Sequence, residues 1–185
     1  MGEGPVNGTD VNGTDGGRRT SAWLVWQHVG VDDIVIRQAT DLDLVAAADL
    51  RWMWVVGDKG AEPDVERDVF VDQFVRGAQA SQTHTCFVAV GGGAVVGMAW
   101  LALNTRVPSP RALHRRNGDV QSVYVLRSFR RRGIASALLA AITDAARQFG
   151  AERLTVHSSP EAVSTYDRAG FESSELLRHL ILTAL

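Results

Sequence analysis

The sequence has only one cysteine among its 185 residues, so no disulfide can form within one chain. Cys86 lies in the apolar run HTCFVAV, where we expect a small buried side chain rather than a nucleophile. The chain also lacks an apolar stretch of the roughly 18 residues that a membrane span needs, and it does not begin with the basic and apolar regions of a secretion signal. We therefore expect a cytoplasmic protein with no membrane partner.

A large net charge is also missing, because 19 basic and 21 acidic residues leave a formal charge of -2. The four arginines in the segment RSFRRRGIAS are therefore a local feature of a nearly neutral protein. Binding to RNA through residues 115–116 and 127–132 would need a basic surface or interleaved aromatic side chains, and the sequence offers little of either. We expect no nucleic-acid partner.

The first 20 residues are nearly all Gly, Asn, Thr, Asp and Arg, and they contain VNGTD twice in tandem. This composition cannot bury enough apolar surface to offset the entropy lost on ordering, so it predicts a disordered tail over residues 1–20. Residues 21–185 have the length of a single domain with one core. Trp23 and Trp26 follow the tail in an apolar stretch to which the sequence assigns no role.

Hydrophobic periodicity predicts the element order β-α-α-β-β-β-α-β-α-β. Alternating apolar residues predict a strand near residues 33–40, and TDLD resembles a capping box that opens a helix over residues 42–56. A second helix is predicted to begin near Pro63. HTCFVAV and AVVGMAWLAL then predict two strands joined by a turn at residues 91–93.

A polar connection with prolines, residues 104–119, is predicted to precede a short strand at residues 120–125. A helix that ends at Gly150 follows, since Ile134, Leu138, Ala141, Ile142, Ala145 and Phe149 recur at helical spacing. The remaining expectations are a strand at RLTVHS, a short helix that ends at Gly170, an optional strand at residues 171–175 and a last strand at HLILTAL. This pattern predicts an α+β fold with a mixed, mostly antiparallel central sheet flanked by helices.

The arginine segment runs into Gly133, Ala135 and an apolar-faced helix, an order that places unpaired backbone N–H groups at the start of the helix. The helix dipole reinforces these donors, and a glycine lets a phosphate approach the backbone closely. The segment matches neither the Walker loop nor the dinucleotide fingerprint, which favours a pyrophosphate-bearing cofactor other than a nucleoside triphosphate. A solvated basic turn before a helix is the alternative interpretation.

Two motifs in this part of the chain resemble those of the GNAT superfamily of N-acetyltransferases. Arg130, Gly133 and Ala135 match the signature Arg/Gln-x-x-Gly-x-Gly/Ala between a strand and a helix rich in small residues. The later segment VHSSPEAVSTYDRAGF resembles a second family motif through Ala162, Tyr166, Gly170 and Phe171. The resemblance covers about residues 34–182, and it departs from the family at Ser159, where the family often has asparagine.

The resemblance implies a GNAT-like fold, acetyl-CoA as cosubstrate and the primary amine of a small molecule or peptide as acceptor, with no metal. Backbone N–H groups of residues 131–135 would bind the pyrophosphate, and strand residues 123 and 125 would pair with the pantetheine arm. A backbone N–H near residue 125 would polarise the thioester carbonyl. The implied cofactor-binding residues are Val123, Val125, Arg130, Arg131, Arg132, Gly133, Ile134, Ala135 and Ser136.

Two side chains are candidates for proton transfer. By the resemblance, Tyr166 occupies the position of the general acid for the departing CoA thiolate. A phenol with a reference pKa of about 10 is a weaker acid than a thiol near 8.5, so Tyr166 would act mainly through a positioned hydrogen bond. His157 is the candidate general base, ahead of His114, and each also has an ordinary structural interpretation.

The acceptor pocket is expected, by the resemblance, at the end of the first helix and in the loop RWMWVVGDKGAE. Trp52 and Trp54 are two positions apart on a helix, so at most one can face the pocket, while Asp58 and Glu62 either attract a cationic amine or lie in solvent. The leading functional hypothesis is an acetyltransferase. The alternative is a catalytically weak acyl-CoA-binding or sensing module, and a homodimer stays open.

Overall fold

The computed structural model describes Met1 and residues 33–180 of the chain. The five strands are β1 (Val35–Gln38), β2 (His84–Gly91), β3 (Ala94–Arg106), β4 (Arg115–Val125) and β5 (Ala151–Val156), and the helices are α1 (Leu44–Trp52), α2 (Arg67–Ala80), α3 (Ile134–Gln148) and α4 (Val163–Arg168). Four short helical segments complete the list: η3 (Asp41–Asp43), η4 (Met53–Asp58), η5 (Arg127–Phe129) and η6 (Pro160–Ala162). The expected tail, Trp23, Trp26 and most of the expected last strand lie outside the described residues.

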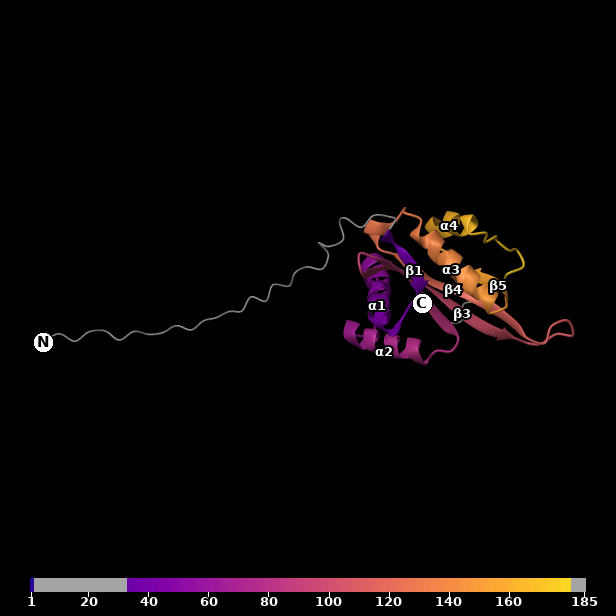
Figure 1. The fold of residues 1–185 in the computed structure, drawn as a ribbon, viewed down its shortest axis with the longest axis horizontal. Helices are drawn as coiled ribbons and strands as arrows, with labels where there is room; N and C mark the ends of the chain where they lie inside the picture. Colours follow the sequence, from indigo (N-terminus) through magenta and orange to yellow (C-terminus); the bar gives the residue numbers. More distant parts are fainter. Residues whose placement is uncertain (2–32, 181–185) are drawn as a thin grey trace.

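The strands form one sheet in the order β1-β2-β3-β4-β5. Neighbouring strands are antiparallel except β4 and β5, which are parallel and are connected through α3. Figure 1 shows α1 and α2 on one side of this sheet and α3 with α4 on the other. The α+β class with a mixed, mostly antiparallel sheet flanked by helices is therefore confirmed.

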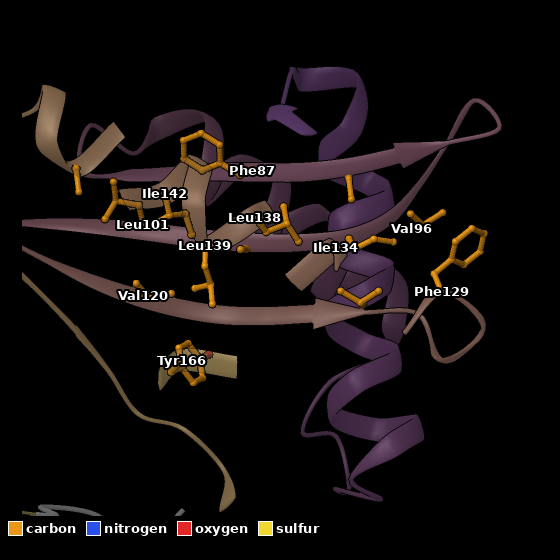
Figure 2. Packing of buried hydrophobic residues seen from close by; sticks show 14 residues of the cluster. Phe87, Val96, Leu101, Val120, Phe129, Ile134, Leu138, Leu139, Ile142 and Tyr166 are labelled. Atoms are coloured by element: carbon orange, nitrogen blue, oxygen red, sulfur yellow. The ribbon is translucent and has the colours of Figure 1, made fainter. Parts of the chain in front are cut away.

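Each face of the sheet has its own core. Alternate residues of β2 separate between the two cores, since Phe87 and Ala89 pack toward α3 whereas Cys86 and Val88 pack toward α1. Leu138, Leu139 and Ile142 of α3 are fully buried against the first face, as Figure 2 shows. Cys86 is buried in the core on the α1 face, as expected, and burial raises the pKa of its thiol to about 12, with the nearby Asp43 charge as a further cause.

The predicted hairpin of β2 and β3 is confirmed, but the polar connection after it is much shorter than expected. β3 continues to Arg106 and β4 begins at Arg115, so the two strands form a second, longer hairpin. The segment NGD has the composition of a turn, yet its Gly118 lies inside β4. A Cβ atom there would collide with Leu154 and come within 2.9 Å of Leu101, so the close approach of the neighbouring side chains requires glycine.

The helical predictions are right in number and less accurate at their ends. The capping box of Thr40 and Asp43 is present, but the first helix begins as a 3₁₀ turn, continues as α1 and ends in the π-helical segment η4. The second helix begins at Arg67 rather than near Pro63, because residues 61–66 are extended or bent.

The predicted helix α3 and its stop at Gly150, where φ is +71°, are confirmed. Phe149 is nevertheless 43% exposed, so it does not belong to the buried face. Residues 171–175 form no strand, and neither do the described residues His179 and Leu180 of the expected last strand. Within residues 33–180, no helix is long and apolar enough to cross a membrane.

Asp43 anchors the start of α1 to strand β1, and its removal gives a measurable loss of stability. Its carboxylate accepts two hydrogen bonds from Arg37, at 2.6 and 2.9 Å, and another at 2.7 Å from the Thr40 N–H. The Arg37 hydrogen bond holds the pKa of this buried carboxyl well below its usual range, against the opposing effect of burial. Asp43→Asn is expected to lower the free energy of unfolding by about 2 kcal/mol at pH 7.

The stability difference between the wild type and Asp43→Asn depends on pH, because folding lowers the pKa of Asp43. Stability from the ionised carboxyl is complete above the unfolded-state pKa of about 3.9 and is lost as pH falls toward the lower folded-state pKa. Urea unfolding of the wild type and Asp43→Asn is therefore expected to converge as pH falls from about 5 toward 2. A constant difference over that range would show that the charge contributes nothing.

Candidate active site

A cavity of about 560 Å³ lies where β4 and β5 separate. The two strands pair only as far as Val120 and Val156, but β4 continues to Val125. The lining comes from η4 and the residue after it, from β4, from the turn and first residues of α3, and from the segment between β5 and the end of α4. The lining residues are Trp54, Lys59, Val120, Ser122, Val123, Tyr124, Val125, Phe129, Arg130, Arg131, Gly133, Ile134, Ala135, Ser136, His157, Ser158, Ser159, Glu161, Ala162, Thr165, Tyr166 and Arg168.

A bulge in β4 sets which side chains face which side of this cavity. Met98 pairs with Tyr124 and Trp100 pairs with Gln121, so two residues of β4 lie opposite Ala99 alone, and Ser122 has a φ of 53°. The extra residue places Val123 with Val120 on the α3 face and Tyr124 on the α1 face. The sequence has no glycine or other turn signal at Ser122, so this bulge was not predictable.

The edge of β4 beyond the bulge presents backbone groups to the cavity. The Leu126 N–H donates to the Val96 carbonyl at 2.9 Å, toward β3. Because N–H directions alternate along a strand, the N–H groups of Val125 and Val123 point to the opposite side, where β5 has ended. An extended ligand with amide groups can therefore pair with this edge as a strand would.

The start of α3 forms another wall of the cavity. Gly133 is the N-cap residue, with a φ of +77°, and no side chain caps the helix. The N–H groups of the first turn, at Ile134, Ala135 and Ser136, therefore have no acceptor within the helix, and all three residues line the cavity. This arrangement is suited to an anion such as a phosphate.

The three consecutive arginines have three different environments. Arg131 lines the cavity next to the start of α3. Arg130 also lines it, but its Nε donates to the Val125 carbonyl at 2.9 Å and its Nη2 donates to Asp58 at 2.9 Å. Arg132 is not among the lining residues, and its guanidinium lies 5.2 Å from the centroid of the Phe129 ring. The three arginines therefore do not all face the cavity, although all three were expected to bind the cofactor.

Asp58 connects three elements at one edge of the cavity. Its carboxylate accepts hydrogen bonds from Arg127 Nε at 2.9 Å, Arg130 Nη2 at 2.9 Å and the Tyr124 hydroxyl at 3.1 Å. Burial opposes ionisation, but these donors outweigh it and lower the pKa of Asp58. The hydrogen bonds join the end of η4 to β4 and to the turn before α3. From the sequence, Asp58 was expected either to attract a cationic amine or to lie in solvent, and this structural role was not identified.

The two candidate proton-transfer residues line the same cavity. In the chain, His157 precedes η6 and Tyr166 follows it. Tyr166 is 9% exposed, packs edge to face on Phe171 at 5.6 Å, and its burial raises the pKa of its phenol. Its hydroxyl makes no hydrogen bond with another described residue. His157 follows the last residue of β5, is exposed, and lies edge to face with His179 at 5.9 Å.

The expected acceptor loop contributes two residues to the cavity. Trp54 lines it, while Trp52 packs against Phe70 at 5.6 Å, so one tryptophan of the pair faces the site as expected. Lys59 is the second residue. Asp58 and Glu62 do not line the cavity, and neither does His114, which lies in the β3–β4 hairpin. Within the described residues, no group of three or more His, Cys, Asp or Glu side chains is placed to hold a metal.

Comparison with protein families identifies the chain. The model described as "Acetyltransferase (GNAT) family" matches residues 47–171, which include the cavity-lining parts of η4, β4, α3 and α4. The chain therefore belongs to the GNAT acetyltransferase family, in which acetyl-CoA is the cosubstrate and its acetyl group is transferred. No curated protein matches the chain.

Solved structures share this fold. A predicted acetyltransferase from Clostridium acetobutylicum, solved with acetyl-CoA, has a TM-score of 0.67 and 19% identity over 80% of this chain and 96% of that chain. AAC(6')-Iy, in complex with the bisubstrate analogue CoA-S-monomethyl-acetylneamine, has a TM-score of 0.62 and 22% identity over 82% and 99%. Glucosamine-6-phosphate N-acetyltransferase from Arabidopsis thaliana has a TM-score of 0.61 and 13% identity over 81% and 99%.

The Asp58 contacts predict a loss of stability on truncation. Asp58→Ala removes the acceptor of the part-buried Tyr124 hydroxyl and the carboxylate that pairs with Arg127 and Arg130. Because Arg127 and Arg130 are 69% and 45% exposed, the expected decrease in the free energy of unfolding is only about 1 kcal/mol. Urea unfolding measures it, with Asp144→Ala as the control, since Asp144 makes an exposed ion pair with Arg147 within α3. Equal midpoints for the two variants would contradict the role assigned to Asp58.

Proposed function

We propose that this protein transfers an acetyl group from acetyl-CoA to the primary amine of a small molecule or peptide. The observation that carries the proposal is the convergence of three features on one cavity: the uncapped start of α3, the unpaired edge of β4 and the Tyr166 side chain. A transferase needs an anion site, a site for an extended arm and a proton donor near the reacting thioester. These features supply one of each.

The residues present fit acetyl-CoA. Gly133 has open space where a Cβ atom would stand, so a pyrophosphate can approach the backbone of residues 131–135. Arg131 and Ser136 lie beside this backbone, and Val123 and Val125 present their N–H groups to a pantetheine arm. We retain the whole predicted set as cofactor-binding residues except Arg132, which does not line the cavity.

Acetyl-CoA supplies a thioester whose acetyl carbon is open to attack by an amine. In the proposed mechanism a backbone N–H near Val125 stabilises negative charge on the carbonyl oxygen, and the Tyr166 hydroxyl donates a hydrogen bond to the departing sulfur. The raised pKa of Tyr166 keeps its phenol protonated and able to donate. His157 is the candidate that receives the proton from the amine, directly or through water.

Two neighbours support an amine as the acceptor. The names of glucosamine-6-phosphate N-acetyltransferase and the acetylneamine complex of AAC(6')-Iy describe acetylation of nitrogen in those proteins. We extend the proposal to one acetyltransferase domain over residues 21–185, with a cytoplasmic location. A catalytically weak acyl-CoA-binding module is the second candidate, because Ser159 lines the cavity where the family often has asparagine.

A thiol-release assay with acetyl-CoA and a panel of amines tests the proposal. The panel contains a peptide N-terminus, a polyamine, an amino sugar and small monoamines, and calorimetry with acetyl-CoA accompanies it. Binding together with amine-dependent thiol release is the expected result. Binding without thiol release for any amine would favour the sensing module.

Gly133 is predicted to matter for acetyl-CoA binding more than for folding. In Gly133→Ala the new Cβ enters the space that the pyrophosphate would occupy, so acetyl-CoA affinity should fall about tenfold, or about 1.4 kcal/mol. Gly150→Ala is the matched control, because its φ of +71° imposes similar backbone strain at the other end of α3, away from the cavity. Equal acetyl-CoA affinities of the two variants by calorimetry would remove Gly133 from the site.

Tyr166→Phe separates transfer from binding. A hydrogen bond that strengthens only as the carbon–sulfur bond breaks affects turnover and not the affinity for acetyl-CoA. We expect kcat to fall on the order of 10²-fold, with the dissociation constant of acetyl-CoA changed by less than about twofold. Because the hydroxyl makes no hydrogen bond with another described residue, the melting temperature should change little. Near-normal turnover in this variant would exclude Tyr166 from the mechanism.

A further inference from the structure

We infer that the acceptor carries an anionic group, a carboxylate or a phosphate, beside the amine that is acetylated, and that Lys59 binds this group. The inference rests on the proposed function and adds the substrate class. Lys59 is the only lysine in the 185-residue sequence, whose other 18 basic residues are arginines. It lines the cavity described above.

The position of Lys59 assigns it to the acceptor side. Its Nζ lies 4.5 Å from the centroid of the Trp54 ring, which stacks on Tyr124 at 5.9 Å. Tyr124 and Trp54 belong to the core on the α1 face of the sheet, whereas Ile134 at the start of α3 belongs to the core on the other face. Lys59 and the proposed pyrophosphate site therefore enter the cavity from different faces of β4.

No nearby carboxylate neutralises Lys59 within the described residues. Asp58, its neighbour in the chain, accepts hydrogen bonds from Arg127, Arg130 and Tyr124 instead. The carboxylate that lines the cavity, Glu161, lies in η6 after β5. Arg51 also lies on the Trp54 ring, with its guanidinium carbon 4.8 Å from the centroid, but it does not line the cavity. Among the lining residues on this side, Trp54, Tyr124 and Lys59, the lysine therefore carries the charge that an acceptor meets.

This charge distribution discriminates among amines. A polyamine or an amino sugar with several ammonium groups meets like charge at Lys59, which disfavours binding. A carboxylate or phosphate next to the amine pairs with the ammonium through a charge-assisted hydrogen bond. The Lys59 charge also favours the neutral form of an amine bound close to it, which is the form that attacks. The same side chain thus binds the acceptor and assists its deprotonation.

Pairs of amines that differ by one anionic group test the inference. Phenylalanine is compared with phenethylamine for a carboxylate, phosphoethanolamine with ethanolamine for a phosphate, and spermidine represents the polycations. The proteins are wild type, Lys59→Met, which keeps the packing on Trp54 without the charge, and Lys59→Arg, which keeps the charge. For at least one pair, wild-type kcat/KM should be about tenfold higher for the anionic member. The preference should vanish in Lys59→Met and persist in Lys59→Arg.

Three results would overturn the inference. One is an equal or better rate with spermidine or with the amines that lack the anionic group. Another is an unchanged preference in Lys59→Met. The last is a Lys59→Met effect confined to the KM of acetyl-CoA, which would place Lys59 at the cosubstrate.

Calorimetry with the same amines in the presence of CoA distinguishes this inference from the proposed function. Binding of an anionic amine that depends on Lys59, without thiol release, would refute acetyl transfer and support the anion site. The absence of both binding and thiol release for all of the amines would overturn both proposals.

Discussion

The separation of β4 from β5 is the constraint on which the rest of the site depends. Their parallel pairing ends at Val120 and Val156, and the bulge at Ser122 turns β4 away from its neighbour. The last five residues of β4, 121–125, therefore have no strand beside them on the β5 side. Unpaired backbone groups beside a core are costly unless a partner binds them, so the fold retains hydrogen-bonding capacity for a ligand at this place. Both hydrophobic cores hold this edge rigid, because Val125 packs on one face and Tyr124 on the other.

Internal ion pairing determines which charges remain for ligands. Asp58 engages Arg127 and Arg130, and Arg130 also holds the Val125 carbonyl, so these arginines serve mainly to fix the end of β4. Arg131, the first turn of α3 and Lys59 line the cavity, and in the proposed function they are the groups that meet anions. Neighbouring arginines of the sequence therefore differ in their contacts, because a single carboxylate, 69 and 72 residues away from them, engages Arg127 and Arg130.

The strongly periodic elements were predicted well from the sequence, and residues of the two short motifs line the cavity. Helix α3, the β2–β3 hairpin and the capping box followed from local spacing and appear in the structure. The β3–β4 hairpin was missed because polar residues such as those at 115–119 occupy a strand that extends beyond the helices, as Figure 1 shows, and Gly118 resembles a turn residue. The π-helical segment η4 and the bulge at Ser122 were missed because each arises from tertiary packing and has no local signature.

Tertiary contacts also changed the interpretation of the expected acceptor loop. From the sequence, Asp58 and Glu62 were expected either to attract a cationic amine or to lie in solvent. Counting charges along a loop treats each side chain as free, but the structure shows that the nearer carboxylate is already satisfied by two arginines and a phenol. The charge available to a ligand is therefore what remains after internal pairing, and of the charged residues at positions 58–62 only Lys59 lines the cavity, whereas Asp58 and Glu62 do not. The π-helical turn contributes to this difference, because it is where Asp58 ends η4 against β4 while Trp54 and the following Lys59 line the cavity.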